Sequence, residues 1–204
     1  MKMNLANKLT IFRILLVPVM MLVPIIDNLV GIHGEFLGIS TAFWIMNIIF
    51  IIASITDKLD GSIARSRNLV TTFGKFLDPI ADKILVLAAL IMLVDFGKIP
   101  AWIPIIILFR EFVVSGYRLI ASQNGGEVIA ASIWGKLKTV TQMIAIILAY
   151  VDIGNFGECF VGELTGIRFY INLLTTMMML VSVVATVFSG WDYLKGGKDL
   201  LKDK

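Results

Sequence analysis

Residues 36–55 read FLGISTAFWIMNIIFIIASI and contain no charged side chain. A membrane-spanning helix needs about 20 mostly apolar residues, so this stretch is long enough to cross a bilayer. Only Thr56 separates it from the sequence DKLDGSIAR at residues 57–65, where charge begins abruptly. Because charges at membrane depth must face a polar cavity or pair with one another, the junction predicts a spanning helix that ends in a polar site.

The composition of the whole chain also indicates a membrane protein. Of its 204 residues, 58% are hydrophobic and only 16% are charged, whereas a soluble domain normally contains about a quarter charged residues. No linker rich in Pro, Gly or Ser interrupts the chain. We therefore expect a single domain over residues 1–204.

Further apolar stretches predict the remaining spans. They lie at residues 11–26, 79–94, 99–121, 137–151 and 169–189. Together with residues 36–55 they predict an all-α, polytopic membrane protein of six transmembrane helices, with a short amphipathic segment at the N-terminus.

The distribution of basic residues orients these predicted spans. With the N-terminus in the cytoplasm, every Lys and Arg except Lys98 and Arg168 falls on the inner side, in agreement with the positive-inside rule. We expect a multi-pass protein of the cytoplasmic (inner) cell membrane. Both termini and the polar site would then lie on the cytoplasmic side.

Two pairs of aspartates follow the apolar stretch, Asp57 with Asp60 and Asp78 with Asp82. At about 100° per residue, each pair lies on one face of a helix. The chain has one cysteine and one histidine, so a metal would be held by oxygen ligands, which suits Mg²⁺ or Mn²⁺. Two divalent cations would balance four clustered carboxylates and clamp the oxygens of a displacement at phosphorus.

Residues 57–82 resemble the signature of the CDP-alcohol phosphatidyltransferase family, D-x-x-D-G-x-x-A-R-x(8)-G-x-x-x-D-x-x-x-D, at every fixed position. Members of this family displace CMP from a CDP-linked lipid or alcohol with an alcohol hydroxyl. The resemblance implies that Asp82 touches the metal site and is the general base. It further implies metal ligands at Asp57, Asp60 and Asp78, and a CDP site lined by Gly61, Ala64, Arg65 and Gly74.

Other segments are similar to bacterial phosphatidylglycerophosphate synthases. These are NLANKLTIFRILLVP at residues 4–18, REFVVSGYR at residues 110–118 and WGKLKTVTQ at residues 134–142. In that subfamily glycerol 3-phosphate attacks CDP-diacylglycerol, giving phosphatidylglycerophosphate and CMP in acidic phospholipid biosynthesis. The expected partners are these two substrates, the lipid bilayer and a second copy of the chain, with no nucleic acid.

Four basic residues at the inner ends of the predicted fourth and fifth spans could bind the acceptor phosphate: Arg110, Arg118, Lys136 and Lys138. The two arginines could instead anchor the chain to the inner leaflet. The two lysines are about 200° apart on a helix, so only one of them is expected to face the pocket.

Two other groups of residues have open or surface roles. For Asn7 and Arg13, a nucleotide contact and surface anchoring are both possible. Trp191, Tyr193 and the lysines from Lys195 onward are typical of an interfacial belt with a basic tail.

Two alternatives to a glycerol 3-phosphate transferase remain open from the sequence. The first keeps the chemistry and changes the acceptor to phosphatidylglycerol, serine or inositol phosphate. The second is a cation or proton transporter, because acidic residues within membrane helices often mark ion paths. A transporter, however, gives no reason for Gly61, Arg65 and Gly74 at their spacing.

Overall fold

A computed structural model describes residues 5–31, 34–66, 72–123, 133–162 and 164–196. Side chains are described for residues 7–31, 34–56, 77–118, 133–162 and 164–195. The described residues form six α-helices, one two-stranded antiparallel hairpin and one 3-10 turn, which confirms the all-α class. They fall into two compact units, one of Met1–Phe96 with Ala149–Ile153 and the other of Gly97–Leu148 with Gly154–Lys204.

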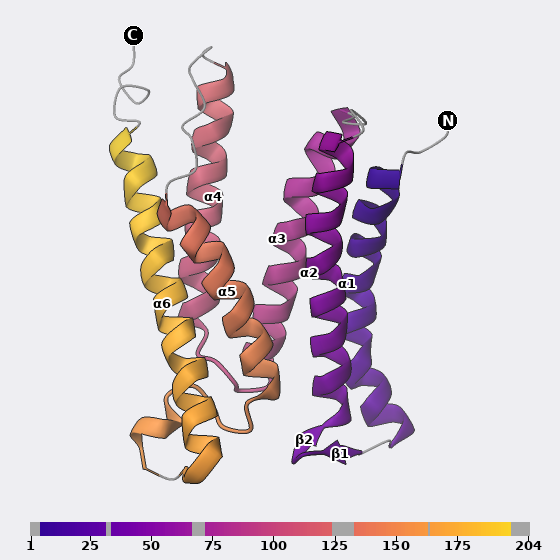
Figure 1. Ribbon diagram of the computed structural model, residues 1–204, viewed down its shortest axis with the longest axis vertical. Helices are drawn as coiled ribbons and strands as arrows, with labels where there is room; N and C mark the ends of the chain where they lie inside the picture. The colour runs from indigo at the N-terminus through magenta and orange to yellow at the C-terminus, as the bar shows by residue number, and fades with distance from the viewer. Residues whose placement is uncertain (1–4, 32–33, 67–71, 124–132, 163, 197–204) are drawn as a thin grey trace. The chain divides into compact units, whose positions relative to one another are not determined.

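The first unit contains three helices side by side: α1 (Leu5–Val30), α2 (Thr41–Ser66) and α3 (Thr72–Asp95) (Figure 1). Helix α1 packs against both α2 and α3. Fully buried apolar side chains from all three helices form the core of this unit, among them Met20, Phe50 and Leu90. The short amphipathic segment predicted at the N-terminus is, from residue 5 onward, the beginning of α1.

A small hairpin corrects the predicted start of the second span. Strand β1 (Glu35–Phe36) pairs with β2 (Ile39–Ser40), so the helix begins at Thr41 and not at residue 36. The turn residues Leu37 and Gly38 have φ of 58° and 77°, the left-handed pair that suits a two-residue hairpin turn. The Trp44 Nε1–H donates to the Phe36 carbonyl at 3.1 Å, which ties the hairpin to α2.

The helices also extend beyond the apolar stretches that predicted them. The apolar stretch at residues 79–94 lies within α3, which begins at Thr72, so Pro79 lies inside the helix. Asp78 is helical, as its spacing of four from Asp82 predicts, and so is Gly74. Hydropathy marks only the apolar length of a helix, whereas the backbone hydrogen bonds continue into the polar turns at its end. The prediction that each pair of aspartates lies on a helix is confirmed, with Asp57 and Asp60 in α2 and Asp78 and Asp82 in α3.

The second unit contains α4 (Trp102–Gln123), most of α5 (Ile133–Val151), the 3-10 turn η1 (Glu158–Phe160) and α6 (Gly166–Gly196). Helix α4 packs against α6 around buried side chains such as Ile103, Ile107 and Met179. Buried hydroxyls on α6 donate to carbonyls of their own helix, as Thr186 Oγ1 does to the Ser182 carbonyl at 2.6 Å. A polar side chain satisfied in this way can lie in an apolar interior.

The loop between α5 and α6 is fixed by the fully buried Asn172. Its Oδ1 accepts the Cys159 N–H at 2.9 Å and its Nδ2 donates to the Asn155 carbonyl at 2.9 Å. A Cβ added at Gly154 would approach the Asn172 Nδ2 to 2.7 Å, so only glycine leaves room for the amide. These contacts anchor the beginning of α6, whose opposite end carries part of the candidate site.

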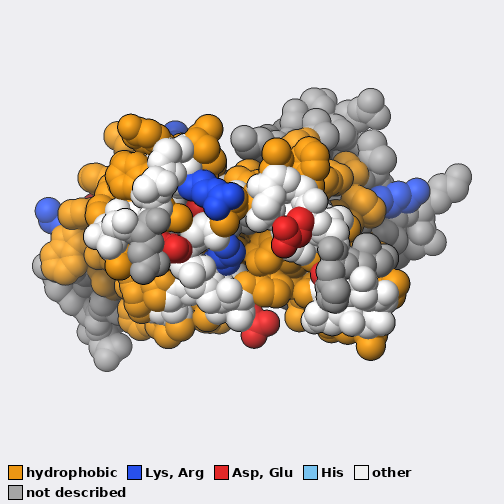
Figure 2. Space-filling view, turned by 90° about the horizontal axis from the view of Figure 1, so that it is seen from below, with side chains coloured by type: hydrophobic (Ala, Val, Ile, Leu, Met, Phe, Trp, Pro, Cys, Tyr) orange, Lys and Arg blue, Asp and Glu red, His pale blue; other side chains and the backbone are white. Residues whose placement is uncertain are grey.

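Exposed apolar side chains cover much of both units. Two described helical segments, Asn7–Val30 and Gly166–Lys195, are long and apolar enough to cross a membrane, and Thr41–Thr56 is apolar but shorter. Hydrophobic side chains make up much of the surface seen in Figure 2, and residues such as Leu22, Leu29 and Tyr170 are exposed. These surfaces fit a membrane-associated protein.

Candidate active site

In the first unit, two polar contacts join α1 to α3. The Thr10 hydroxyl donates to Asp78 Oδ1 at 2.7 Å, and Arg13 Nη1 forms an ion pair with Asp82 Oδ1. The residues are three apart on α1 and four apart on α3, so each pair lies on one helical face. The contacts therefore place both described aspartates of the signature against the first helix.

Arg13 is 0% exposed, while the side chain of Asp82 is 44% exposed. A guanidinium buried without a counter-charge would cost several kcal/mol, whereas a paired one keeps a charge-assisted hydrogen bond. The interaction thus holds one Asp82 oxygen in place while part of this carboxylate stays accessible to a ligand.

This geometry corrects one of the open interpretations of the N-terminal helix. Asn7, Thr10 and Arg13 are all buried, on the face of α1 that contacts α3. A role in anchoring to the membrane surface requires exposure, so that interpretation is wrong for Asn7 and Arg13. Thr10 was not singled out from the sequence, although its spacing of three from Asn7 and from Arg13 was a signal for it.

The remaining signature residues are described by their backbone alone. Asp57, Asp60, Gly61, Ala64 and Arg65 lie in the C-terminal part of α2. Helix α2 contacts α3, and Gly74 lies in the first turn of α3. The side chains of all six residues fall outside the described ones.

The predicted metal site therefore stays a prediction. Among the described residues, no group of three or more His, Cys, Asp or Glu side chains could hold a metal ion. The predicted cluster needs the carboxylates of Asp57 and Asp60, which are not among the described side chains.

A second polar cluster lies in the second unit, around Glu111 of α4. Glu111 Oε1 accepts from Arg110 Nη1 at 3.1 Å and forms an ion pair with Lys138 Nζ of α5. Lys138 is only 8% exposed, whereas Lys136 is exposed. Only one of these two lysines is therefore buried, and it is Lys138; that it faces a pocket for the acceptor stays a prediction.

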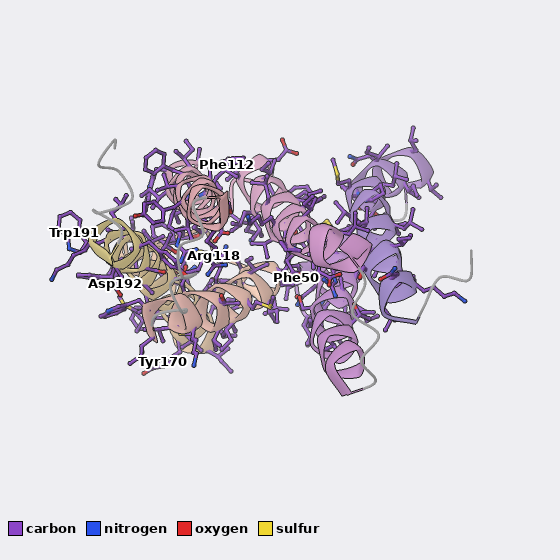
Figure 3. The ribbon with its side chains drawn as sticks, turned by 90° about the horizontal axis from the view of Figure 1, so that it is seen from above. Phe50, Phe112, Arg118, Tyr170, Trp191 and Asp192 are labelled. Atoms are coloured by element: carbon purple, nitrogen blue, oxygen red, sulfur yellow. The ribbon has the colours of Figure 1, made fainter. Side chains whose placement is uncertain are left out.

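Helix α6 adds two residues to this cluster. Arg110 Nη2 donates to Ser189 Oγ, and Arg118 Nη2 donates to Tyr193 Oη. Tyr193 is 2% exposed, so its assignment to an interfacial belt is wrong. Trp191 is 66% exposed and lies on the outer side of α6, away from Arg118 (Figure 3), as a belt residue would.

Two buried donors in the second unit have no acceptor in the described part of the chain. They are Arg110 Nε and the Nε2 of Gln142, whose side chain lies one turn beyond Lys138 on α5. Buried donors are normally satisfied, so a ligand oxygen would suit both positions. Gln142 was not singled out from the sequence, although its i, i+4 spacing from Lys138 was a signal for it.

Comparison with known proteins identifies the family. The family model described as CDP-alcohol phosphatidyltransferase matches residues 3–188, which include helices of both units. The chain belongs to the CDP-alcohol phosphatidyltransferase family. The matched residues include the whole signature at residues 57–82, and also Arg13, Arg110, Glu111, Arg118 and Lys138.

Several relatives of this phosphatidyltransferase cover nearly the whole chain. A Bacillus subtilis protein named CDP-diacylglycerol–glycerol-3-phosphate 3-phosphatidyltransferase is 43% identical over 202 residues, covering 98% of this chain and 97% of the relative. A Mycobacterium tuberculosis protein named probable phosphatidylglycerophosphate synthase is 39% identical, covering 94% of this chain and 80% of its own length. A Haemophilus influenzae protein with the same name as the first is 33% identical, covering 100% of this chain and 98% of the relative.

The Arg13–Asp82 ion pair of this phosphatidyltransferase leads to a stability prediction. Replacing Arg13 with Met should destabilise the protein by about 1–3 kcal/mol, because Asp82 loses a charge-assisted hydrogen bond. This range is below that of a fully buried pair because nearly half of the Asp82 side chain is exposed. Thermal unfolding of the purified protein in detergent should show a melting temperature lower by several degrees.

Lys8→Met is the matched control, since Lys8 is an exposed basic residue on the same helix. It should leave the melting temperature within about one degree of wild type, because exposed charges contribute little. Equal stability of the Arg13→Met and Lys8→Met proteins would show that the buried ion pair does not hold α1 to α3.

Proposed function

We propose that this protein transfers the phosphatidyl group of CDP-diacylglycerol to the hydroxyl of glycerol 3-phosphate, giving phosphatidylglycerophosphate and CMP. The observation that carries the proposal is the Bacillus subtilis relative of that name, aligned over 98% of this chain. Family membership favours this chemistry over the transporter alternative. Three cations of the second unit, Arg110, Arg118 and Lys138, form what we call the basic cluster. This cluster favours an acceptor that carries a phosphate.

The reaction is a displacement at phosphorus. The acceptor hydroxyl oxygen forms a bond to the phosphorus of the phosphatidyl group, the bond from that phosphorus to the CMP oxygen breaks, and CMP leaves. The hydroxyl proton must move to a base, and a positioned carboxylate can take it. Asp82 is our candidate for the general base, because Arg13 orients one of its oxygens and part of the carboxylate remains exposed.

The four aspartates of the signature suit two divalent cations, Mg²⁺ or Mn²⁺. The two described carboxylates, Asp78 and Asp82, lie on one face of α3, and Asp57 and Asp60 lie within one turn of each other on α2. All four supply hard oxygen ligands, as these cations prefer. When bound, such ions neutralise charge on the phosphate oxygens of a displacement.

The CDP moiety would lie against Gly61, Ala64, Arg65 and Gly74. Glycine has no Cβ, so Gly61 and Gly74 would let a pyrophosphate approach the helix backbone closely. The guanidinium of Arg65 can hold a phosphate through two parallel hydrogen bonds.

The acceptor phosphate would bind to Arg110, Arg118 and Lys138. Arg110 and Lys138 share Glu111 as a carboxylate partner, and Arg118 contacts Tyr193. A phosphate dianion would supply further negative charge to these three cations. The free donor at Arg110 Nε offers a further hydrogen bond. Lys136 is exposed and is better placed for lipid headgroups than for this site.

We further propose a six-span topology in the cytoplasmic membrane, with both termini and the site on the cytoplasmic side. Two segments already meet the length and hydropathy of a span, and the distribution of Lys and Arg supports the orientation. The chain would act as one domain over residues 1–204, because one family model covers residues from both units. The exposed apolar helices also suit a homodimer within the bilayer.

The first test concerns the metals. Turnover, measured as CMP release from CDP-diacylglycerol, should require Mg²⁺ or Mn²⁺ and stop in excess EDTA, because the proposed ligands are all carboxylates. Asp57→Ala, Asp60→Ala and Asp78→Ala should each abolish turnover while the protein still inserts into membranes. Full activity in EDTA, or a near-normal rate in any of these variants, would exclude the two-metal site.

The second test concerns the acceptor. Lys138→Met and Arg110→Ala should raise the KM for glycerol 3-phosphate at least about tenfold, because each removes one partner of a desolvated charge pair. The KM for CDP-diacylglycerol should change little, and free glycerol should be a poor acceptor. Lys136→Met is the matched control, and it should keep wild-type kinetics.

The same kinetic comparison includes serine, phosphatidylglycerol and inositol phosphate as acceptors. Better use of any of these than of glycerol 3-phosphate would contradict the proposed function and leave the family assignment intact. Equal effects of Lys138→Met and Lys136→Met would remove Lys138 from the acceptor site.

A further inference from the structure

Tyr193 lies within reach of both arginines of the basic cluster. Its ring centroid is 5.6 Å from Arg110 Cζ and 5.2 Å from Arg118 Cζ. A guanidinium within about 6 Å of an aromatic ring is attracted by the negative charge of the ring face. One buried ring therefore stabilises two cations that would otherwise repel each other.

The hydroxyl of Tyr193 makes a second, directional contact. It accepts a hydrogen bond from Arg118 Nη2. Arg118 is exposed, so without this partner its long side chain would sample several rotamers. The ring and the hydroxyl together limit where the guanidinium of Arg118 can lie.

Two neighbouring residues of α6 act on the other arginine. Ser189 Oγ accepts from Arg110 Nη2, and a Cβ added at Gly190 would come within 3.3 Å of Arg110 Cγ. The absence of a side chain at Gly190 thus lets Arg110 lie close against α6. Residues 189, 190 and 193 lie within about one turn of this helix, at the end opposite its anchored start.

We propose that Tyr193 is a positioning residue for acceptor recognition, holding Arg110 and Arg118 in the geometry that binds the phosphate of the acceptor. This inference rests on the proposed function, since it takes the ligand of the two arginines to be the phosphate of glycerol 3-phosphate. Pre-ordering the two side chains removes part of the entropy cost of binding. Tyr193 therefore acts through the arginines and sets the affinity for a phosphate-bearing acceptor.

The test compares Tyr193→Phe and Tyr193→Leu with wild type in full kinetics. Tyr193→Leu removes the ring and the hydroxyl and should raise the KM for glycerol 3-phosphate about tenfold. Tyr193→Phe removes only the hydroxyl and should raise it about threefold. The kcat and the KM for CDP-diacylglycerol should stay within about twofold of wild type, because the observed contacts of Tyr193 are with the two arginines of the acceptor site.

Tyr170 supplies the matched control on the same helix. It is an exposed tyrosine near the start of α6, and Tyr170→Phe and Tyr170→Leu should keep wild-type kinetics. A double-mutant cycle then tests the route of the effect. In an Arg118→Ala background, Tyr193→Phe should cause no further change, because Arg118 is the hydrogen-bond partner of the hydroxyl among the described residues.

The outcomes separate this inference from the proposed function. If wild type makes no phosphatidylglycerophosphate from glycerol 3-phosphate, the proposed function fails whatever the variants do. If wild type makes it and Tyr193→Leu keeps the wild-type KM, the inference alone is overturned. It is also overturned if Tyr193→Leu lowers the melting temperature and kcat with no selective change in the acceptor KM, or if Tyr193→Phe has its full effect in the Arg118→Ala background.

Discussion

The buried ion pair between Arg13 and Asp82 is the constraint on which the first unit depends. Arg13 is wholly buried between apolar helices, and a charge in that position must have a fixed counter-charge. Asp82 supplies it, and Thr10 repeats the pattern with Asp78 one turn earlier on α3. The same two contacts that hold α1 to α3 therefore also orient the two described carboxylates of the family signature.

In the second unit, too, partly buried charges are stabilised by pairing, but there one carboxylate is paired with two cations. Here Glu111 pairs with both Arg110 and Lys138, and Tyr193 of α6 contacts Arg110 and Arg118. The buried donor Arg110 Nε has no acceptor within the described part of the chain. One cluster thus contains carboxylates that a cation could bind, and the other contains cations that an anion could bind.

The sequence predicted much of this arrangement because its strongest signals are local. The aspartate signature depends on helical spacing alone, and six apolar stretches each correspond to a helix. Hydropathy placed the start of the second helix too early, since residues 36–40 carry no charge and were counted in the span but belong to a hairpin. The buried positions of Arg13 and Tyr193 could not be predicted, because burial depends on which helices pack together. An arginine near the start of a membrane helix and a tyrosine near the end of one are, from composition alone, typical of the membrane surface.

The account is tested most directly by comparing nucleotide binding with turnover in Asp82→Asn. This substitution keeps the shape of the side chain and a possible acceptor for Arg13, but removes the carboxylate that would accept the proton. We expect metal-dependent CMP binding to remain close to wild type while the transfer rate falls about 100-fold or more, as expected for loss of a general base. Near-normal turnover, or loss of CMP binding together with turnover, would contradict the assignment of Asp82 as the base held by Arg13.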